Sequence, residues 1–298
     1  MKLKKLVALV SSAILAFSLV GCSIEGEENG ASSDGSLVGN GSIGFSVSTL
    51  NNPFFVTLSQ GAKDKAKEEG RDLIVVDAGD DAAKQTSDIE DLISKNISVL
   101  IVNPVDSDAV APAVKDAIAK GIKVISLDRA VNGVDVDCSI ASDNVEGARM
   151  ATEYLVSLVG KDAKVVELEG TSGSSATIDR GAGFHKIADD QLNVVSSQTA
   201  NFNRSEGMTV MENMLQSNSD IKGVFAHNDE MALGAVEAIG SKNIIVVGFD
   251  STDDAVAAIK KGKMAATVAQ KPDLMGATAV ETAIKIINGE AVEKSIPV

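Results

Sequence analysis

The sequence predicts an α/β protein built on parallel sheets. Short apolar runs alternate with amphipathic stretches from Ser42 onward, and such alternation indicates βαβ units with right-handed crossovers. Hydrophobic residues make up 44% of the 298 residues but aromatic residues only 3%, so we expect an aliphatic core. Runs rich in Val and Ile are typical of strands that are buried on both faces. A chain of this length can bury the cores of one large or two medium domains.

The first strand and the first helix are joined by the segment Ser48–Phe55, which reads STLNNPFF. The apolar run Ile43–Val47 before it indicates a buried strand. Pro53 suits the first helical position, Asn52 suits the cap, and Gly70 is placed to end the helix in a left-handed turn. Ligands bind at such strand-to-helix turns in open parallel sheets. This turn has no phosphate-cradling glycines, and its amides and phenylalanines favour a neutral polyol with an apolar C–H face.

The later elements follow the same rhythm along the chain. Helical patterns lie between most of the apolar runs, at residues 88–95, 108–120, 145–159 and 205–216. Ten strands are expected, at Ile43–Val47, Leu73–Val76, Val99–Val102, Val124–Leu127, Cys138–Ala141, Lys164–Leu168, Val194–Ser197, Gly223–Ala226, Ile244–Phe249 and Ala265–Ala269.

Ten strands can form one sheet or two, and two observations favour two. Residues 128–137 interrupt the rhythm, so that one strand follows another with no helix between them, and the chain could leave the first sheet there. The stretch from Gly41 to Val298 also exceeds the usual size of a single domain.

Residues 1–22 are typical of a bacterial lipoprotein signal peptide. Three lysines precede an apolar run that is too short and too weakly flanked to span a membrane. The run ends in Leu19-Val20-Gly21-Cys22, which resembles the lipobox, whose cysteine is diacylated. We therefore expect lipidation at Cys22, which would leave Cys138 without a disulfide partner. An ordinary signal peptide with a chance cysteine is the alternative.

Residues 23–40 are rich in Gly, Ser, Glu and Asn and contain few apolar residues. This composition predicts a flexible tether between a membrane anchor and the folded part of the chain.

The net charge of −15 argues against binding to nucleic acid or to an anionic membrane surface.

Most of the candidate binding residues lie just past a predicted strand. Carboxylates accept hydrogen bonds from two sugar hydroxyls, guanidinium groups donate to two hydroxyl oxygens, and phenylalanine faces contact the C–H side of a pyranose. Together these groups predict a pocket with apolar walls and a few placed polar groups. The polar candidates at strand ends are Asp128, Arg129, Asn228, Asp250 and Gln270, and Arg180 and Phe202 lie in later segments.

Each candidate also has a structural interpretation, which the residues alone leave open. An aspartate after a strand, such as Asp250, is usually a cap or turn residue. Asp128 and Arg129 could form a surface ion pair of little value. Asn228 could cap the following helix, and Phe55 lies on a helical stripe that favours a core position over a binding one.

Catalysis finds little support in the sequence. His185 and His227 are the only histidines, and neither has metal-ligand spacing. No nucleophile elbow and no phosphate-binding glycine loop follows a strand; Gly181 and Gly183 lie inside a helical stretch. We therefore predict a protein that is not an enzyme and that has no catalytic residues, no metal site and no cofactor.

Read together, the segments resemble those of the periplasmic ribose-binding proteins, which are type I solute-binding proteins of ABC importers. The resemblance runs from about Ser42 to Val298, and the order and spacing of its motifs are more specific than any one of them. The motifs are STLNNPFF at 48–55, NPVDSDAV at 103–110, LDRA at 127–130, IASDN at 140–144, DRGAGF at 179–184, HNDEMALGA at 227–235, VVGFD at 246–250 and ATVAQ at 266–270.

The resemblance implies two Rossmann-like lobes with parallel sheets, joined by a multi-crossover hinge and clamping a sugar between them. The implied boundaries are 41–142 plus 271–298 for the N-terminal lobe and 143–270 for the C-terminal lobe. Hinge positions are implied at Ser142, Asp143, Gln270 and Lys271. The implied ligand-binding residues are Asn52, Phe54, Phe55, Asp128 and Arg129 from the first lobe, Arg180, Phe202, Asn228 and Asp250 from the second, and Gln270 at the hinge.

The function implied by the resemblance is delivery of D-ribose to an ABC permease and its ATPase. We expect a monomer that is anchored by lipid to the outer face of the cytoplasmic membrane, on the periplasmic side if the cell has an outer membrane; docking by a chemoreceptor is left open. Another monosaccharide such as allose is the near alternative, and the ligand-sensing domain of a LacI-type repressor is the alternative from another class. The family continues past Val298 with a short strand, so we also expect that this chain is a fragment or is less stable than a longer relative.

Overall fold

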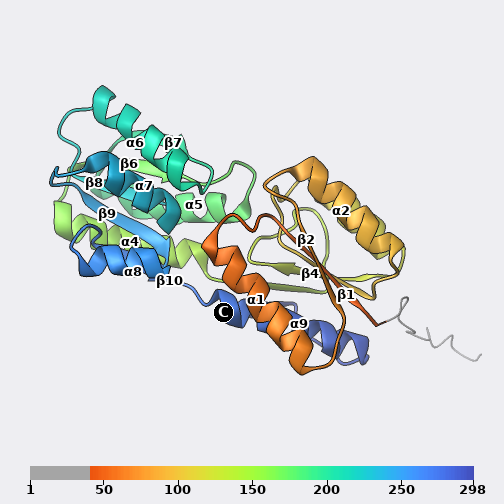
Figure 1. The fold of residues 1–298 in the computed structure, drawn as a ribbon. Coiled ribbons are helices and arrows are strands. Elements are labelled where there is room, and N and C mark those ends of the chain that lie inside the picture. The colour runs from red at the N-terminus through yellow and green to blue at the C-terminus, as the bar shows by residue number, and fades with distance from the viewer. Residues whose placement is uncertain (1–40) are drawn as a thin grey trace, which may run out of the picture. The chain divides into compact units, whose positions relative to one another are not determined.

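The computed structural model describes residues 41–298 (Figure 1). The predictions of a signal peptide over residues 1–22, of lipidation at Cys22 and of a tether over 23–40 lie outside the described residues. Within residues 41–298, no helix is both long enough and apolar enough to cross a membrane.

Two parallel sheets organise the described chain. The first has the strand order β11-β5-β4-β3-β1-β2, and the second has the order β10-β9-β8-β6-β7. All pairs of neighbouring strands are parallel. The strands are β1 (Ile43–Val47), β2 (Leu73–Asp77), β3 (Val99–Val102), β4 (Lys123–Leu127), β5 (Cys138–Ala141), β6 (Lys164–Glu169), β7 (Asn193–Thr199), β8 (Gly223–Ala226), β9 (Ile245–Asp250), β10 (Ala266–Ala269) and β11 (Ser295–Pro297).

Helices cover the faces of both sheets, so each sheet with its helices forms a lobe. The first lobe is the first sheet with α1 (Pro53–Glu68), α2 (Ala82–Ser94), α3 (Ala111–Ala119) and α9 (Pro272–Ile287). The second lobe is the second sheet with α4 (Asn144–Val159), α5 (Ser175–Gln191), α6 (Arg204–Ser217), α7 (Asp229–Ile239) and α8 (Asp253–Lys260). The α/β fold class predicted from the sequence is therefore confirmed, whereas the residue-level lobe boundaries stay a prediction.

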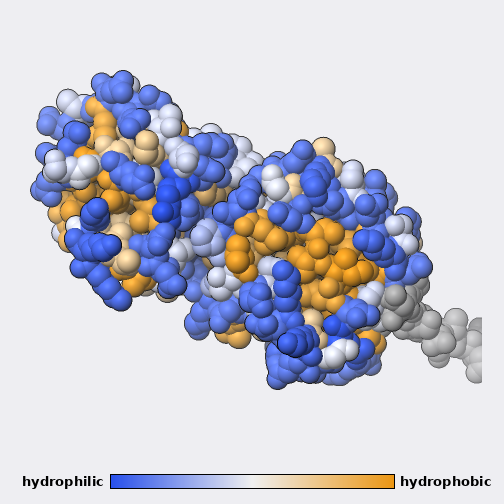
Figure 2. Space-filling model, viewed as in Figure 1, coloured by the Kyte–Doolittle hydropathy of each residue, from blue (hydrophilic) through white to orange (hydrophobic). Residues whose placement is uncertain are grey.

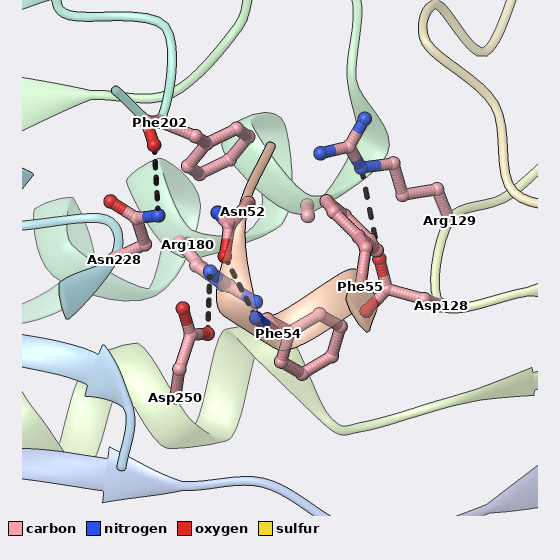
Figure 3. A pocket seen from close by; sticks show the side chains of 10 residues that line it. Asn52, Phe54, Phe55, Asp128, Arg129, Arg180, Phe202, Asn228 and Asp250 are labelled. Atoms are coloured by element: carbon pink, nitrogen blue, oxygen red, sulfur yellow. Dashed lines mark hydrogen bonds and ion pairs between the residues drawn. The ribbon is translucent and has the colours of Figure 1, made fainter. Parts of the chain in front are cut away.

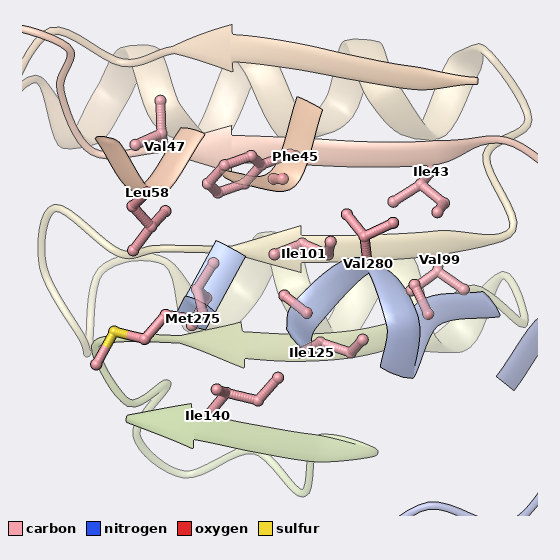
Figure 4. Packing of buried hydrophobic residues seen from close by; sticks show 14 of the residues in the cluster. Ile43, Phe45, Val47, Leu58, Val99, Ile101, Ile125, Ile140, Met275 and Val280 are labelled. Atoms are coloured by element: carbon pink, nitrogen blue, oxygen red, sulfur yellow. The ribbon is translucent and has the colours of Figure 1, made fainter. Parts of the chain in front are cut away.

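The core of the first lobe lies between the sheet and the helix pair α1 and α9. Aliphatic side chains of β1 and β3 meet Leu58 of α1 and Val280 of α9 there, all of them fully buried (Figure 4). The two helices approach closely, because a Cβ atom at Gly61 would lie 2.1 Å from the carbonyl oxygen of Asp273. This packing fixes the start of α1, from which three of the predicted binding residues come.

Strand β2 forms one edge of the first sheet. Its residues 73–77 are only half-buried, unlike the fully buried strands β1 and β3. Figure 2 shows apolar side chains gathered on the surface in this region, between α1 and α2. The end of this edge strand nevertheless supports the turn after β1, because the N–H of Leu50 donates to Oδ1 of Asp77 at 3.2 Å.

Two details of the topology differ from the sequence analysis. Strand β5 follows β4 without a helix, as expected, but it stays in the first sheet as the parallel neighbour of β4, because Leu127 and Ile140 are register partners in the same buried layer. The chain changes sheets only after Ala141. Strand β11 was not among the ten expected strands; it pairs in parallel with β5 at the edge of the first sheet.

Candidate functional site

A cavity lies where the carboxyl ends of the two sheets face each other (Figure 3). Side chains of the first lobe point into it from the turns after β1 and β4. Side chains of the second lobe point into it from the turn after β8 and from the end of β9. Nine of the ten predicted ligand-binding residues line it, together with Ala176: Asn52, Phe54, Phe55, Asp128, Arg129, Arg180, Phe202, Asn228 and Asp250. Gln270, the tenth, stands behind Asp250.

The turn after β1 supplies an aromatic wall. The rings of Phe54 and Phe55 meet edge to face with centroids 5.1 Å apart, and both side chains are buried. Both phenylalanines belong to the core cluster and both line the cavity. A core position and a binding position are therefore not alternatives for Phe55. Asn52 caps α1 by accepting a hydrogen bond from the backbone N–H of Phe54 at 2.9 Å, as its position predicted.

The turn after β4 supplies an acidic and a basic side chain, both about 4% exposed. Nε of Arg129 lies 3.7 Å from Oδ2 of Asp128, and Nη1 donates to the carbonyl of Pro104 at 2.8 Å. Asn103 donates to the same carboxylate oxygen at 3.2 Å. The pair is therefore buried, not a surface ion pair, and Nε of Arg129 has no hydrogen-bond partner within residues 41–298. An unpaired buried donor is costly unless a ligand oxygen fills it.

A second acid–base pair comes from the other lobe. Nη1 of Arg180 lies 3.7 Å from Oδ1 of Asp250, and its Nε donates to Oδ1 of Asn144 at 2.9 Å. Gln270 donates to Oδ1 of Asp250 at 2.7 Å, so it orients this carboxylate from behind. Asp250 ends β9 and does not cap a helix; Thr252 caps α8 instead.

Phe202 and Asn228 complete the wall of the second lobe. Asn228 caps α7 by accepting from the N–H of Met231 at 3.0 Å, and its amide donates to the carbonyl of Phe202 at 3.2 Å. The ring of Phe202 lies 5.3 Å from the guanidinium of Arg129 and 5.8 Å from that of Arg180. Such contacts favour a cation over an aromatic face and hold both guanidinium groups at the rim of the cavity.

Burial dominates the electrostatics of the cavity. It raises the pKa of Asp128 and raises that of Asp250 well above its usual range, although the neighbouring arginines oppose the shift. Burial likewise lowers the pKa of Arg129 and of Arg180. Two carboxylates and two guanidinium groups give the cavity no net charge when all are ionised, so the arrangement suits a neutral ligand with many hydroxyl groups.

Backbone strain is concentrated at the same place. Asp128, Phe202 and Asp250 have φ values of 64°, 58° and 124°, in the region that L-residues rarely adopt. Strain of this kind persists only where the surrounding structure enforces it, and it clusters at ligand sites. Here it turns the side chains at the strand ends into the cavity.

Several contact residues escaped the sequence analysis. Asn103 follows β3 directly, so the strand-end rule that found Asp128 could also have found it. Asn144 holds Arg180 across 36 residues of chain, and Gly170 leaves room for the ring of Phe202, because a Cβ there would lie 2.0 Å from Cζ. No local pattern signals either of these long-range contacts.

Direct hydrogen bonds also join the lobes beside the cavity. The N–H of Ser107 donates to the carbonyl of Gly173 at 3.0 Å, and its hydroxyl accepts from the N–H of Ser175 at 3.1 Å. The hydroxyl of Ser175 accepts from the N–H of Ala130 at 2.9 Å. We call Ser107, Ala130, Gly173 and Ser175 the interlobe clasp.

The expected hinge residues lie where the chain passes between the sheets. Ser142 donates from its hydroxyl to the carbonyl of Val298 at 3.1 Å, and Asp143 caps α4 by accepting from the N–H of Glu146. Lys271 directly precedes α9. Their role as a hinge stays a prediction. Within residues 41–298, no cluster of three or more potential metal ligands is present.

Two parallel α/β lobes with a polar, aromatic-walled cavity between their strand ends have the architecture of a two-lobed solute-binding protein. A family model described as a periplasmic binding protein domain matches residues 43–291. The chain therefore belongs to the periplasmic binding protein family.

Individual relatives agree with this assignment. The ribose import binding protein RbsB of Bacillus subtilis (strain 168) is 50% identical over 296 residues, which are 99% of this chain and 97% of that protein. The solved structure of an ABC transporter solute-binding protein from Bacillus halodurans C-125 with bound myo-inositol is 35% identical, has a TM-score of 0.83, and covers 87% of this chain and 93% of its own. An ABC transporter solute-binding protein from Actinobacillus succinogenes 130z with bound D-allose is 32% identical, with a TM-score of 0.80, covering 87% and 96%.

Proposed function

We propose that this protein is the substrate-binding component of an ABC sugar importer and that it binds D-ribose in the cavity between the lobes. The observation that carries the proposal is the balanced pair of acid–base couples, Asp128 with Arg129 and Arg180 with Asp250, set between phenylalanine faces.

The separations within each couple leave hydrogen-bonding capacity for a sugar. At 3.7 Å, neither guanidinium forms a direct hydrogen bond with its carboxylate at that contact. Each carboxylate can accept from sugar hydroxyls, and the unpaired Nε of Arg129 can donate to a sugar oxygen. Phe54, Phe55 and Phe202 offer apolar faces for the C–H groups.

The name of the Bacillus subtilis relative, at 50% identity over nearly the whole chain, supports ribose as the ligand. D-allose and myo-inositol are the competing ligands, because solved relatives at 32% and 35% identity carry them.

Membership of the family supports an extracytoplasmic location and a membrane permease with its ATPase as partners. The finer proposals are a lipid anchor at Cys22 within Leu19–Cys22, a monomeric state and docking by a chemoreceptor.

Isothermal titration calorimetry against D-ribose, D-allose, myo-inositol and L-arabinose tests the ligand. We expect D-ribose to bind most tightly, and a saturating excess of about 100 times its dissociation constant to stabilise the protein by about 2.7 kcal/mol in thermal unfolding. Tighter binding of another sugar in the panel would replace ribose as the ligand. Absence of binding to all four would overturn the proposed function.

A further inference from the structure

His227 lies directly before Asn228, behind the wall of the cavity, and its side chain is fully buried. Nε2 of the imidazole lies 2.9 Å from Oε1 of Glu167, whose side chain is also fully buried. Nδ1 faces the backbone N–H of Gly170 at 3.4 Å. Because a backbone N–H can only donate, Nδ1 must be the acceptor, and the proton of the neutral ring must be on Nε2.

This residue connects helix α5 with the turns after β6 and β8, which carry the second lobe's part of the cavity. Its own carbonyl accepts a hydrogen bond from Nη1 of Arg180 at 2.6 Å. Its neighbour Asn228 lines the cavity, and the turn that it contacts through Gly170 borders the ring of Phe202. Displacement of the imidazole would therefore move three groups that face the ligand, although the imidazole itself does not line the cavity.

We propose that His227 is a positioning residue for ligand binding: its Nε2–H tautomer, fixed between Glu167 and Gly170, holds Arg180, Asn228 and Phe202 in the arrangement that receives the sugar. This inference rests on the proposed function of sugar binding at that cavity. The buried Glu167 takes the hydrogen bond that selects the tautomer. The competing explanation for a histidine at this position is simple packing of its aromatic ring against Phe225.

The charges around the imidazole determine its response to pH. Burial lowers the pKa of His227, which outweighs the opposing effect of Glu167, so the ring is neutral at pH 7. From α5, His185 faces the other oxygen of Glu167 at 3.3 Å and also contacts Asp189. Partial burial disfavours a charged His185, but its hydrogen bond with Asp189 and the charge of Glu167 together raise its pKa.

Arg180 disfavours and Glu169 favours a proton on the ring of His227, and both effects are smaller than that of burial. A proton added to Nδ1 would place an N–H group of the imidazole against the backbone N–H of Gly170, and two donors cannot bond to each other. This hydrogen bond would then break, so acid should free the turn that contains Gly170. Because the pKa is lowered, this happens below the ordinary histidine value of about 6.5.

Two substitutions at position 227 separate positioning from packing. His227→Leu keeps an apolar side chain against Phe225 but neither accepts from Gly170 nor donates to Glu167. His227→Gln supplies one acceptor and one donor in a group that does not titrate. We expect ribose to bind roughly tenfold more weakly to His227→Leu at pH 7.5 and within about threefold of the unsubstituted protein to His227→Gln.

His185→Leu, at the other histidine of the chain, is the matched control and should leave the affinity within about twofold. Calorimetry on the full-length protein from pH 7.5 to 5 should show a loss of affinity toward acid in the unsubstituted protein and in His185→Leu. The loss should be smaller in His227→Gln. Asp229 and Asp250 also titrate near the site, but they are common to every variant, so the difference between profiles isolates His227.

The inference is overturned if His227→Leu melts cooperatively and binds ribose as tightly as the unsubstituted protein. It is also overturned if the Leu and Gln variants are equally weak, because the aromatic ring alone would then matter. A sugar-independent measurement covers the case in which His227→Leu does not fold. The His185→Leu protein contains a single histidine, so its imidazole ¹⁵N signals belong to His227 alone.

We expect those signals to report a proton on Nε2 and none on Nδ1 at pH 7.5. A proton on Nδ1, or protonation of the ring in acid without loss of affinity, would overturn the inference. If the unsubstituted protein binds no ribose, the proposed function fails, and the ¹⁵N signals still decide whether the tautomer is fixed as proposed.

Discussion

Substitution of Arg129 by alanine is the most direct test of the site. The guanidinium is 4% exposed, donates to the carbonyl of Pro104 at 2.8 Å and lies 3.7 Å from Asp128. The rings of Phe55 and Phe202 stand 5.0 and 5.3 Å from it. Its removal would leave the carboxylate of Asp128 buried with only Asn103 as a hydrogen-bond donor to its Oδ2, and would take a donor from the cavity.

The expected loss follows from the burial of this charge. Arg129 and Asp128 do not bond directly at 3.7 Å, so the hydrogen bond at stake is the one that the buried guanidinium donates to the sugar. Truncating one partner of a buried, charged hydrogen bond costs about 2–5 kcal/mol, of which much is the penalty of the group left unpaired. At about 1.4 kcal/mol for each factor of ten, ribose should bind at least roughly thirtyfold more weakly to Arg129→Ala. Calorimetry at pH 7.5 measures this loss.

Arg149→Ala is the matched control, because it removes the same side chain from a partly exposed position that does not line the cavity. Arg149 lies on α4 and pairs with Glu146 at 2.6 Å and with Glu153. Exposed pairs of this kind contribute about 0–1 kcal/mol, so we expect unchanged affinity and a small change in melting temperature. An Arg129→Ala protein that melts cooperatively and binds ribose within threefold of the unsubstituted protein would remove Arg129 from the site. Equal losses in both variants would trace the effect to net charge.

Three further predictions concern the acid, the glycine and the clasp. Burial raises the pKa of Asp250 in the free protein, and ribose hydroxyls that donate to its carboxylate should lower this pKa again. Ribose binding should therefore release protons and weaken as the pH falls, and Asp250→Asn should abolish this proton release. Calorimetry in buffers of different ionisation enthalpy measures the protons released. Gly170→Ala should push Phe202 into the cavity and weaken binding at least tenfold, whereas Gly181→Ala, where the nearest atom is 3.6 Å away, should not. Ser107→Ala removes one hydrogen bond of the interlobe clasp and should weaken ribose binding roughly two- to tenfold. In small-angle scattering, ribose should reduce the radius of gyration of the unsubstituted protein more than that of this variant.

Each of these three has a clear contrary result. Proton release that is the same in Asp250→Asn would assign the linkage to another group. Tight binding by Gly170→Ala would mean that Phe202 can move aside without loss. A scattering profile that ribose leaves unchanged would indicate a preformed cavity and no closure.

The sequence predicts the strand-end residues because geometry makes them converge. In a parallel sheet all carboxyl ends lie at one edge, so Asp128, Asn228 and Asp250 needed only the correct strand ends to be placed together. The cap interpretation of Asn228 was also correct, because one oxygen caps α7 while the residue lines the cavity. Capping and binding are therefore not exclusive, because a side chain at a helix start can satisfy both.

The remaining features depend on contacts that no local pattern encodes. Arg180 lies inside α5 and Phe202 lies in a turn, so neither follows a strand directly and the strand-end rule does not place them in the cavity. Strand β11 has three residues, too few for a period-two pattern, and its place is set by pairing with β5 about 156 positions earlier. The partnership of Glu167 with His227 spans 60 residues, so it appears only once β6 and β8 are neighbours.

The distribution of charge between the lobes bears on how a neutral sugar could close them. Each lobe carries one acid–base couple, Asp128 with Arg129 or Arg180 with Asp250, so each half of the cavity is electrically balanced by itself. Balanced halves attract each other only weakly across the cleft, so net Coulomb attraction supplies little of the drive to close. A ligand shifts such an equilibrium only by its difference in affinity for the two states. A sugar that bonds to both couples at once has that difference, because the second set of bonds forms only on closure.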